Sequence, residues 1–305
     1  MTKIFIDGSA GTTGLRIVER LKNREDIELI RIPEDLRKDR KTREEAINAA
    51  DIAFFCLPDA AAVEAAALVH GNTVVIDTST AHRTMPDWDY GFPELCGLRE
   101  RIAVSHRVAN PGCHASGFIS LIEPLVREKL ISPDTALTCF SVTGYSGGGK
   151  GMIAEYQSDG KDSELDAPRQ YAITQEHKHL KEMVKLCSLT TAPVFCPIVS
   201  DYYSGMVVTV PLFRKYLRGN AEDVVALYRE LYRGPVVHYK HYDEAMIAGN
   251  RISGRDDMEI TVAGNEERLL LISCFDNLGK GASGAAIQNM NIILGLEQTT
   301  GLVLE

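Results

Sequence analysis

The sequence lacks the features of a secreted, membrane-spanning or disulfide-bonded protein. Its seven Cys show no Cys-x-x-Cys spacing, several lie inside apolar runs such as IAFFCLP and LLLISCF, and there is a single Trp. Scattered thiols in odd number are typical of a reduced cytoplasmic protein and predict neither a disulfide framework nor a zinc site. No apolar stretch approaches the roughly 18 residues of a membrane span, and a strand pattern begins by Lys3 without a signal-peptide pattern. We therefore expect a cytoplasmic protein.

Positive charge is also in deficit. Lys and Arg number 33 against 42 Asp and Glu, which gives a formal net charge of −9. Such a field repels nucleic acid and anionic membranes, so we expect small-molecule partners, and an anionic substrate would need basic residues gathered locally. The 305 residues, 45% of them hydrophobic, suffice for one large or two ordinary globular domains.

A glycine-rich turn follows the first apolar segment. The stretch KIFIDGSAGTTGLRIVERL has the pattern of a strand, a turn and an amphipathic helix. Its Gly-x-x-Gly-x-x-Gly spacing is one residue longer than the dinucleotide fingerprint, and the alternative is a tight turn with no ligand. Because glycines let the backbone approach a pyrophosphate at a helix N-terminus, the context favours a nucleotide. The expected cofactor-binding residues are Gly8, Ser9, Ala10, Gly11, Thr12, Thr13 and Gly14.

The chain divides into two parts that differ in their pattern of expected strands and helices. Before residue 113, the strand-like runs IELIRI, IAFFCLP and NTVVIDTST alternate with helical stretches, which predicts a Rossmann-like, doubly wound parallel sheet of the α/β class. After it, ALTCFSVTGYSG, VFCPIV, GMVVTVPL and LLLISCF indicate several strands with few intervening helices. We expect there a second, mixed α+β domain with a largely antiparallel sheet, followed by a C-terminal helix.

The end of the second strand bears on the choice of nucleotide. An acid there accepts from the ribose 2′-hydroxyl of NAD, whereas this chain has Arg31 followed by a basic segment, which suits the 2′-phosphate of NADP. The alternative is a solvated helix face, with Glu34 and Asp35 nearby. NADP is the preferred cofactor.

One cysteine stands apart from the others. Cys113 follows a Pro-Gly turn, and apolar residues from Phe118 onward recur at helical spacing, so a helix should begin near it. Its free N–H groups and dipole would stabilise a thiolate. The alternative is a small buried residue, which we expect for Cys56, Cys139 and Cys274. The turn context favours Cys113 as a nucleophile.

A proton-transfer partner is available in QEHKHLKEMVKL. On a predicted helix, His177 and His179 would lie about 200° apart, so they could not both point at one atom. His177 lies nearer the inward stripe. Either could instead be a helix-start or surface histidine, and a metal site is disfavoured because ligands on one helix face need i, i+4 spacing.

Taken together, these segments resemble a known family. GSAGTTG, DTSTAHR, YGFPEL, NPGCHASG, SVTGYSGGGK, EHKHLKE and DNLGKGASGAAIQNMN occur in the order found in the short-form N-acetyl-γ-glutamyl-phosphate reductases of arginine biosynthesis. The chain departs from that family by His114-Ala115 where Tyr-Pro is usual, by Lys150 where Arg is usual, and in its glycine loop.

The resemblance implies an architecture and a reaction. Residues 1–112 with 277–305 would bind NADP, and residues 113–276 would form the catalytic and oligomerisation domain of a dimer or tetramer. NADPH would reduce N-acetyl-γ-glutamyl phosphate to N-acetylglutamate 5-semialdehyde and phosphate through a thioester on Cys113. His177 would be the acid/base, and His179 a candidate for that role or for substrate binding.

It also implies further site residues. Ser79, Gly147 and Asn277 would join Arg31 and the glycine loop in binding cofactor. The substrate would be bound by Arg83, Asn110, Ser141, Gly144, Ser146 and Lys150, of which Arg83 and Lys150 would meet the phosphate.

Rival functions remain open. Aspartate-semialdehyde dehydrogenase shares the chemistry, but its catalytic histidine lies where this chain has SDYYSGMVV. A reductase of carrier-linked aminoadipyl or glutamyl phosphate is disfavoured by the acidic net charge. In a cysteine hydrolase the glycine loop would have no function. In a non-catalytic NADP-sensing protein, Cys113 and the histidines would have none.

Overall fold

The computed structural model describes residues 1–304, which divide into two compact units. The first comprises Met1–Pro111 and Ala282–Leu302, and the second comprises Gly112–Gly281 with Val303 and Leu304. Asn277, expected in the nucleotide-binding domain, lies in the second unit because its side chain donates to Ser146 Oγ at 2.9 Å and accepts from the Gly205 N–H at 2.9 Å.

The first unit is built on a six-stranded sheet whose strand pairs are all parallel. In spatial order its strands are β2 (Ile27–Ile30), β1 (Thr2–Asp7), β3 (Ile52–Phe55), β4 (Val74–Asp77), β6 (Arg107–Ala109) and β5 (Asp89–Tyr90). The chain starts at β1, places β2 on one side and β3 on the other, and so makes a topological switch point between β1 and β3.

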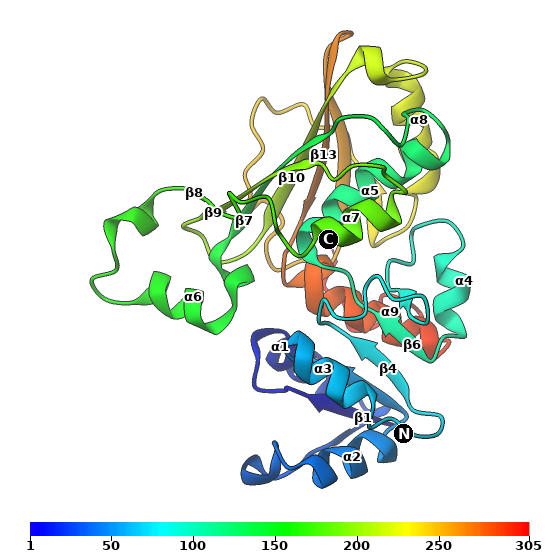
Figure 1. The fold of residues 1–305 in the computed structure, drawn as a ribbon, viewed down its shortest axis with the longest axis vertical. Helices are drawn as coiled ribbons and strands as arrows, with labels where there is room; N and C mark the ends of the chain where they lie inside the picture. The colour runs from blue at the N-terminus through cyan, green and yellow to red at the C-terminus, as the bar shows by residue number, and fades with distance from the viewer. Residues whose placement is uncertain (305) are drawn as a thin grey trace. The chain divides into compact units, whose positions relative to one another are not determined.

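Helices cover both faces of this sheet (Figure 1). They are α1 (Thr12–Leu21), α2 (Arg40–Ala49), α3 (Asp59–Ala66), α4 (Leu98–Ala103) and α9 (Gly284–Ile293). Successive strand residues point to opposite faces: Ile4 and Ile6 pack in one buried cluster with α1, α4 and α9, whereas Phe5 packs in another with α2 and α3. The predicted doubly wound class is confirmed.

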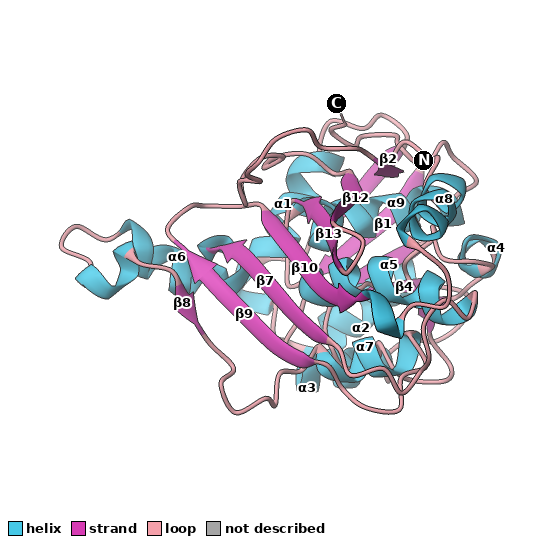
Figure 2. Ribbon diagram, turned by 90° about the horizontal axis from the view of Figure 1, so that it is seen from above, coloured by secondary structure: helices cyan, strands magenta, loops and turns pink. Residues whose placement is uncertain are grey.

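The second unit is built on a seven-stranded mixed sheet (Figure 2). In spatial order its strands are β11 (Val237–Tyr239), β12 (Met258–Gly264), β13 (Arg268–Phe275), β10 (Met206–Phe213), β7 (Thr138–Gly144), β9 (Val194–Ser200) and β8 (Arg169–Gln170). Two pairings, β11 with β12 and β7 with β9, are parallel and the others antiparallel.

Helices pack on one face of that sheet. They include α5 (Cys113–Arg127), α7 (Leu180–Leu186) and α8 (Ala221–Leu231), while α6 (Gly149–Gln157) follows a 3₁₀ turn at the end of β7. A Cβ on Gly117 of α5 would lie 2.5 Å from Val208 Cγ2, so this glycine lets the helix lie close against β10. The opposite face exposes apolar side chains, among them Phe140, Val194, Phe213 and Leu270. Across the described residues, no helix combines the length and apolarity needed to cross a membrane.

Candidate active site

In the first unit, the glycine turn shapes a pocket at the carboxyl ends of β1 and β3. Gly8 adopts φ +85°, and a Cβ there would lie 2.3 Å from the carbonyl oxygen of Cys56. A Cβ on Gly14 would lie 2.4 Å from the carbonyl oxygen of Gly8. Only glycine therefore allows β1, the turn and α1 to approach so closely. The cavity beside this turn has a volume of about 820 Å³, which suits a nucleotide, and its wall includes Gly8, Ser9, Ala10, Gly11 and Arg31.

Basic side chains also line this pocket. Arg43 donates two hydrogen bonds to Asp7 Oδ2, at 3.0 and 2.7 Å, and Arg37 pairs with Glu34 at 3.3 Å. Burial raises the pKa of Asp7 against the opposing effect of Arg43. Among residues 1–304 no ion pair is described for Arg31 or Lys38, which also line the cavity. Their charge is available to an anionic ligand.

Three further predicted site residues lie buried in loops of the first unit. The Ser79 hydroxyl and N–H donate to the Asp77 carboxylate at 2.6 and 2.9 Å. The buried Arg83 guanidinium donates to the carbonyl oxygens of Asn110 and Thr78, both at 2.8 Å. The Asn110 amide donates to the Ala282 carbonyl at 3.0 Å. These hydrogen bonds hold the loops that follow β4 and β6.

In the second unit, Cys113 is the first residue of α5, as predicted. Gly112 precedes it in extended conformation (φ −79°, ψ 143°), and its N–H donates to the buried Glu182 Oε2 at 3.0 Å, which ties the helix start to α7. A Cβ on Gly281 would lie 2.9 Å from Cys113 Cβ, so the backbone at Gly281 packs directly on the cysteine. The thiol is half-buried.

The other thiols range from buried to exposed. Cys139 and Cys274 are buried, as predicted, while Cys56 is half-buried and Cys96 is exposed. Burial raises the pKa of Cys56 and of Cys274 to about 12. These two thiols are therefore protonated at neutral pH and poor nucleophiles.

The histidines lie together, contrary to the prediction that a helix would separate them. Helix α7 begins at Leu180, after both histidines, so the 100° step per residue does not apply to them. The rings of His177 and His179 are 4.7 Å apart, and each lies 5.6 Å from the ring of His114. Three imidazoles thus form one cluster, and one of them, His114, belongs to the helix turn that carries Cys113.

Hydrogen bonding sets the proton position on His177. The His179 backbone N–H donates to His177 Nδ1 at 3.2 Å, so the neutral ring carries its proton on Nε2. Burial, helped by the charge of Lys178, lowers the pKa of His177 to about 4. The ring presents Nε2–H as a donor at neutral pH.

His114 occupies the middle of a hydroxyl–imidazole–hydroxyl chain. Its Nδ1 lies 2.6 Å from Ser141 Oγ, and its Nε2 lies 2.6 Å from the Tyr171 hydroxyl oxygen. Burial, together with the charge of His177, lowers the pKa of His114 to about 3. Burial also raises the pKa of Tyr171, with a smaller contribution from the charge of Cys113. The chain of three is neutral at physiological pH.

The remaining predicted residues of the second unit fall into two places. Ser146 and Asn277 are buried and bonded to each other, and a Cβ on Gly147 would lie 3.5 Å from Asn277 Nδ2. Gly144 is also buried: its N–H donates to the Gly205 carbonyl at 3.0 Å. Lys150, by contrast, is exposed near the start of α6.

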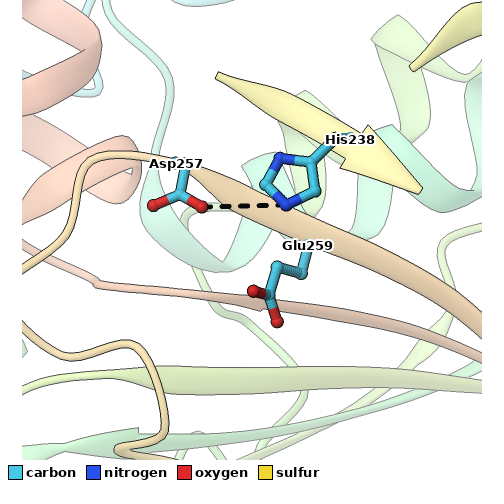
Figure 3. A group of neighbouring side chains, drawn as sticks. All are labelled: His238, Asp257 and Glu259. Atoms are coloured by element: carbon cyan, nitrogen blue, oxygen red, sulfur yellow. Dashed lines mark ion pairs between the residues drawn. The ribbon is translucent and has the colours of Figure 1, made fainter. Parts of the chain in front are cut away.

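A second cluster, drawn in Figure 3, has the donor set of a metal site. Among the described residues, His238, Asp257 and Glu259 have ligand atoms within 4.8 Å of one another, close enough to share a metal ion. Arg255 already donates to both Asp257 oxygens, and Lys240 donates to Glu259 Oε1 at 2.8 Å. Because cations already neutralise both carboxylates, the cluster is an ion-pair network and a poor cation site.

Comparison with known proteins identifies the family. Residues 3–104 match the model of the semialdehyde dehydrogenase NAD binding domain, and residues 113–277 match that of the semialdehyde dehydrogenase dimerisation domain. Proteins named N-acetyl-gamma-glutamyl-phosphate reductase from Brucella ovis and Brucella suis biovar 1 are each 44% identical over 306 residues, covering 96% of this chain and 99% of theirs. The chain belongs to the N-acetyl-γ-glutamyl-phosphate reductase family. The predicted family and nicotinamide cofactor class are confirmed.

Solved structures of aspartate semialdehyde dehydrogenase share the fold of this reductase family member. The Francisella tularensis protein is 14% identical with a TM-score of 0.71, covering 96% of this chain and 100% of that one. The Candida albicans protein, solved with NADP, is 14% identical with a TM-score of 0.69, covering 97% and 99%. Such low identity concerns the fold alone. It agrees with the α/β class and the mixed second unit.

Sequence reasoning missed three residues beside Cys113 of this reductase. The sequence marks His114 only as a departure from the usual Tyr, although its place next to the cysteine was a usable signal. Tyr171 and Glu182 reach the site through long-range hydrogen bonds to His114 and Gly112. No local pattern marks either of them.

Proposed function

We propose that this chain reduces N-acetyl-γ-glutamyl phosphate to N-acetylglutamate 5-semialdehyde and phosphate with NADPH, in arginine biosynthesis. One observation carries the proposal: a half-buried cysteine begins a 15-residue helix, beside the three-imidazole cluster of His114, His177 and His179. That arrangement suits covalent acyl transfer. Membership of the reductase family supports the choice of substrate.

In the first half-reaction, the Cys113 thiolate attacks the acyl carbon. A C–S bond forms, the C–O bond to phosphate breaks, and inorganic phosphate leaves with the bonding electron pair. The helix dipole at the start of α5 favours negative charge on the attacking sulfur and on the carbonyl oxygen. The product is a thioester, a better hydride acceptor than a carboxylate.

In the second half-reaction, the thioester is reduced to the aldehyde. NADPH, when bound, supplies the hydride that this reduction consumes. His177 presents Nε2–H to the oxygen that gains negative charge, and His179 is the alternative donor. Hydride addition gives a thiohemiacetal anion; as its C=O bond reforms, the C–S bond breaks, the aldehyde is released and Cys113 returns as thiolate.

The first unit would bind the nucleotide. Gly8–Gly14 would hold the pyrophosphate at the start of α1, and Arg31 would meet the 2′-phosphate, which supports NADP over NAD. Ser79, Gly147 and Asn277 are further candidates by resemblance. The cavity volume, the close-packed glycines and the available cations all suit this ligand.

The substrate-binding set remains a proposal. Arg83 and Lys150 supply positive charge for the phosphate, one buried and one exposed. Ser141 is bonded to His114, so we assign it an indirect part in shaping the site. Asn110, Gly144 and Ser146 complete the set by resemblance.

We also propose a homo-oligomer, a dimer or tetramer, in the cytoplasm, consistent with the scattered thiols. The chain contains a segment that matches a dimerisation domain, and the exposed sheet face of the second unit carries Phe140 and Leu270, 43% and 40% exposed. Such apolar faces pair with copies of themselves in two-fold dimers. Phe140→Asp should produce monomers in analytical ultracentrifugation; an unchanged mass would place the interface elsewhere.

An acyl-enzyme experiment tests the reaction. Incubation with N-acetyl-γ-glutamyl phosphate but without NADPH should add the acyl mass to Cys113, and Cys113→Ser should abolish the adduct while Cys96→Ser keeps it. Phosphate-dependent reduction of NADP by the semialdehyde should follow. An adduct that forms with β-aspartyl phosphate but not with N-acetyl-γ-glutamyl phosphate would instead establish the aspartate-semialdehyde dehydrogenase alternative. Hydrolysis of the acyl group by water without reduction would establish the hydrolase alternative.

A further inference from the structure

His114 is the buried residue that connects Cys113 to the segment carrying the other histidines. It follows Cys113 in the first turn of α5 and is 3% exposed. Its two ring nitrogens lie 2.6 Å from Ser141 on β7 and 2.6 Å from Tyr171. A neutral imidazole has one N–H and one bare nitrogen, so it donates to one hydroxyl and accepts from the other. Both of its hydrogen-bonding sites are therefore occupied.

Tyr171 begins the histidine loop, which we define as residues 171–179, between β8 and α7. Two residues of this loop that are not glycine have left-handed backbone conformations, Ala172 at φ 50° and Gln175 at φ 61°. Such conformations persist when surrounding contacts over-determine them. Gln175 supplies one anchor, because its side chain exchanges two hydrogen bonds of 2.8 Å with the Phe195 backbone. The bond between Tyr171 and His114 is a second anchor.

The second anchor lies next to His177, the proposed acid/base. The ring of His177 lies 5.6 Å from the ring of His114 and 6.0 Å from the ring of Tyr171, so a shift of either ring would change the packing around His177. We propose that His114 is a positioning residue: its bond to Tyr171 holds the histidine loop, and with it His177, beside the helix turn that carries Cys113. The chemistry it serves rests on the proposed function, whereas the positioning itself does not.

Two substitutions distinguish the two hydrogen bonds of the His114 ring, one to Ser141 and one to Tyr171. A Gln side chain places its amide near the position of Nε2 and can keep the bond to Tyr171, whereas an Asn side chain reaches only the position of Nδ1 and can keep the bond to Ser141. If the hydrogen bond to Tyr171 positions His177, His114→Gln should retain near-normal kcat. His114→Asn should lose about 10²-fold in kcat, the cost of a displacement of roughly 1 Å at a catalytic group, with KM little changed.

The test combines these variants with Tyr171→Phe and the double variant His114→Asn/Tyr171→Phe. Tyr171→Phe should match His114→Asn, and the double variant should be no worse than either, because both remove one interaction. His241→Asn, an exposed histidine of the same unit, is the matched control for the substitution type. Equal kcat for Gln and Asn at position 114, or full kcat in Tyr171→Phe, would overturn the inference. Tyr171→Phe decides the question should an Asn variant fail to fold.

A measurement without substrate or cofactor keeps the two proposals distinguishable. The rate constant for alkylation of Cys113 by iodoacetamide, followed by intact mass in a Cys96→Ala background, reports the surroundings of the sulfur alone. It should change in His114→Asn and Tyr171→Phe and stay at the wild-type value in His114→Gln. If the wild-type protein does not turn over acyl phosphate but this pattern holds, the reaction assignment fails and the positioning stands. If turnover is normal and all variants alkylate alike, the positioning fails and the reaction stands.

Discussion

The backbone N–H of His179 donates a hydrogen bond to Nδ1 of His177, with 3.2 Å between the nitrogens. This contact makes the two neighbours unequal, because one histidine fixes the tautomer of the other. His177 presents Nε2–H, and burial keeps the ring neutral by lowering its pKa to about 4. An imidazole held in this state is suited to donate a hydrogen bond to a developing oxyanion.

His177→Ala should therefore lower kcat by roughly 10²- to 10⁴-fold, the usual contribution of a positioned acid or base. His179→Ala should cost less, because this substitution removes only the imidazole and keeps the backbone N–H that sets the His177 tautomer. Steady-state kinetics of both variants, beside His241→Ala as a surface control, measures the difference. A larger kcat loss in His179→Ala would reverse the assignment of the acid/base.

The buried His114 should make the protein less stable in mild acid. Its folded pKa is about 3, against the usual 6.5, so below pH 6.5 the unfolded chain takes up a proton that the folded chain does not. The free energy of unfolding should fall as pH decreases from 6.5 towards 3, and His114→Gln should reduce this slope. Urea unfolding of both proteins between pH 7 and pH 4 measures it; parallel curves would show that His114 is protonated normally in the folded state.

Gly281→Ala should impair the reaction by moving Cys113. The added Cβ would lie 2.9 Å from Cys113 Cβ and 3.1 Å from the Asp276 carbonyl oxygen, so the backbone must shift. We expect a loss of about 10²-fold in kcat, because a shift of roughly 1 Å at a nucleophile is enough for that. Gly234→Ala is the control, since its Cβ would meet only the Val237 carbonyl oxygen at 3.9 Å. Unchanged kcat in Gly281→Ala would mean that the cysteine tolerates displacement.

Arg31→Asp should weaken NADPH binding more than NADH binding. Arg31 lines the nucleotide pocket, and the substitution places a carboxylate where a 2′-phosphate would lie. Isothermal titration of both nucleotides, with Arg218→Asp as an exposed charge-reversal control in the other unit, measures the selectivity. An equal loss for both nucleotides would indicate damage to the pocket, and stronger binding of NADH by the wild-type protein would remove the NADP assignment.

The sequence by itself determined those features that depend on neighbours along the chain. The strand, glycine turn and helix around Gly8 follow from apolar periodicity and from the left-handed conformation that the turn requires. The start of α5 at Cys113 follows from the Pro-Gly turn and the spacing of apolar residues after it. Alternation of short strands and helices before residue 113 was enough for the doubly wound class, because a parallel strand needs a crossover connection.

Only the tertiary structure decided how the chemically active side chains meet. His177 and His179 share one cluster because they precede α7 in a turn, where helical periodicity gives no direction. Tyr171 bonds to His114 across 57 positions of sequence, and Asn277 bonds to Ser146 across 131, which places Asn277 in the second unit. Periodicity and turn chemistry are local properties of a chain. A hydrogen bond between distant residues exists only once the sheet and its helices have packed, so no local pattern could announce it.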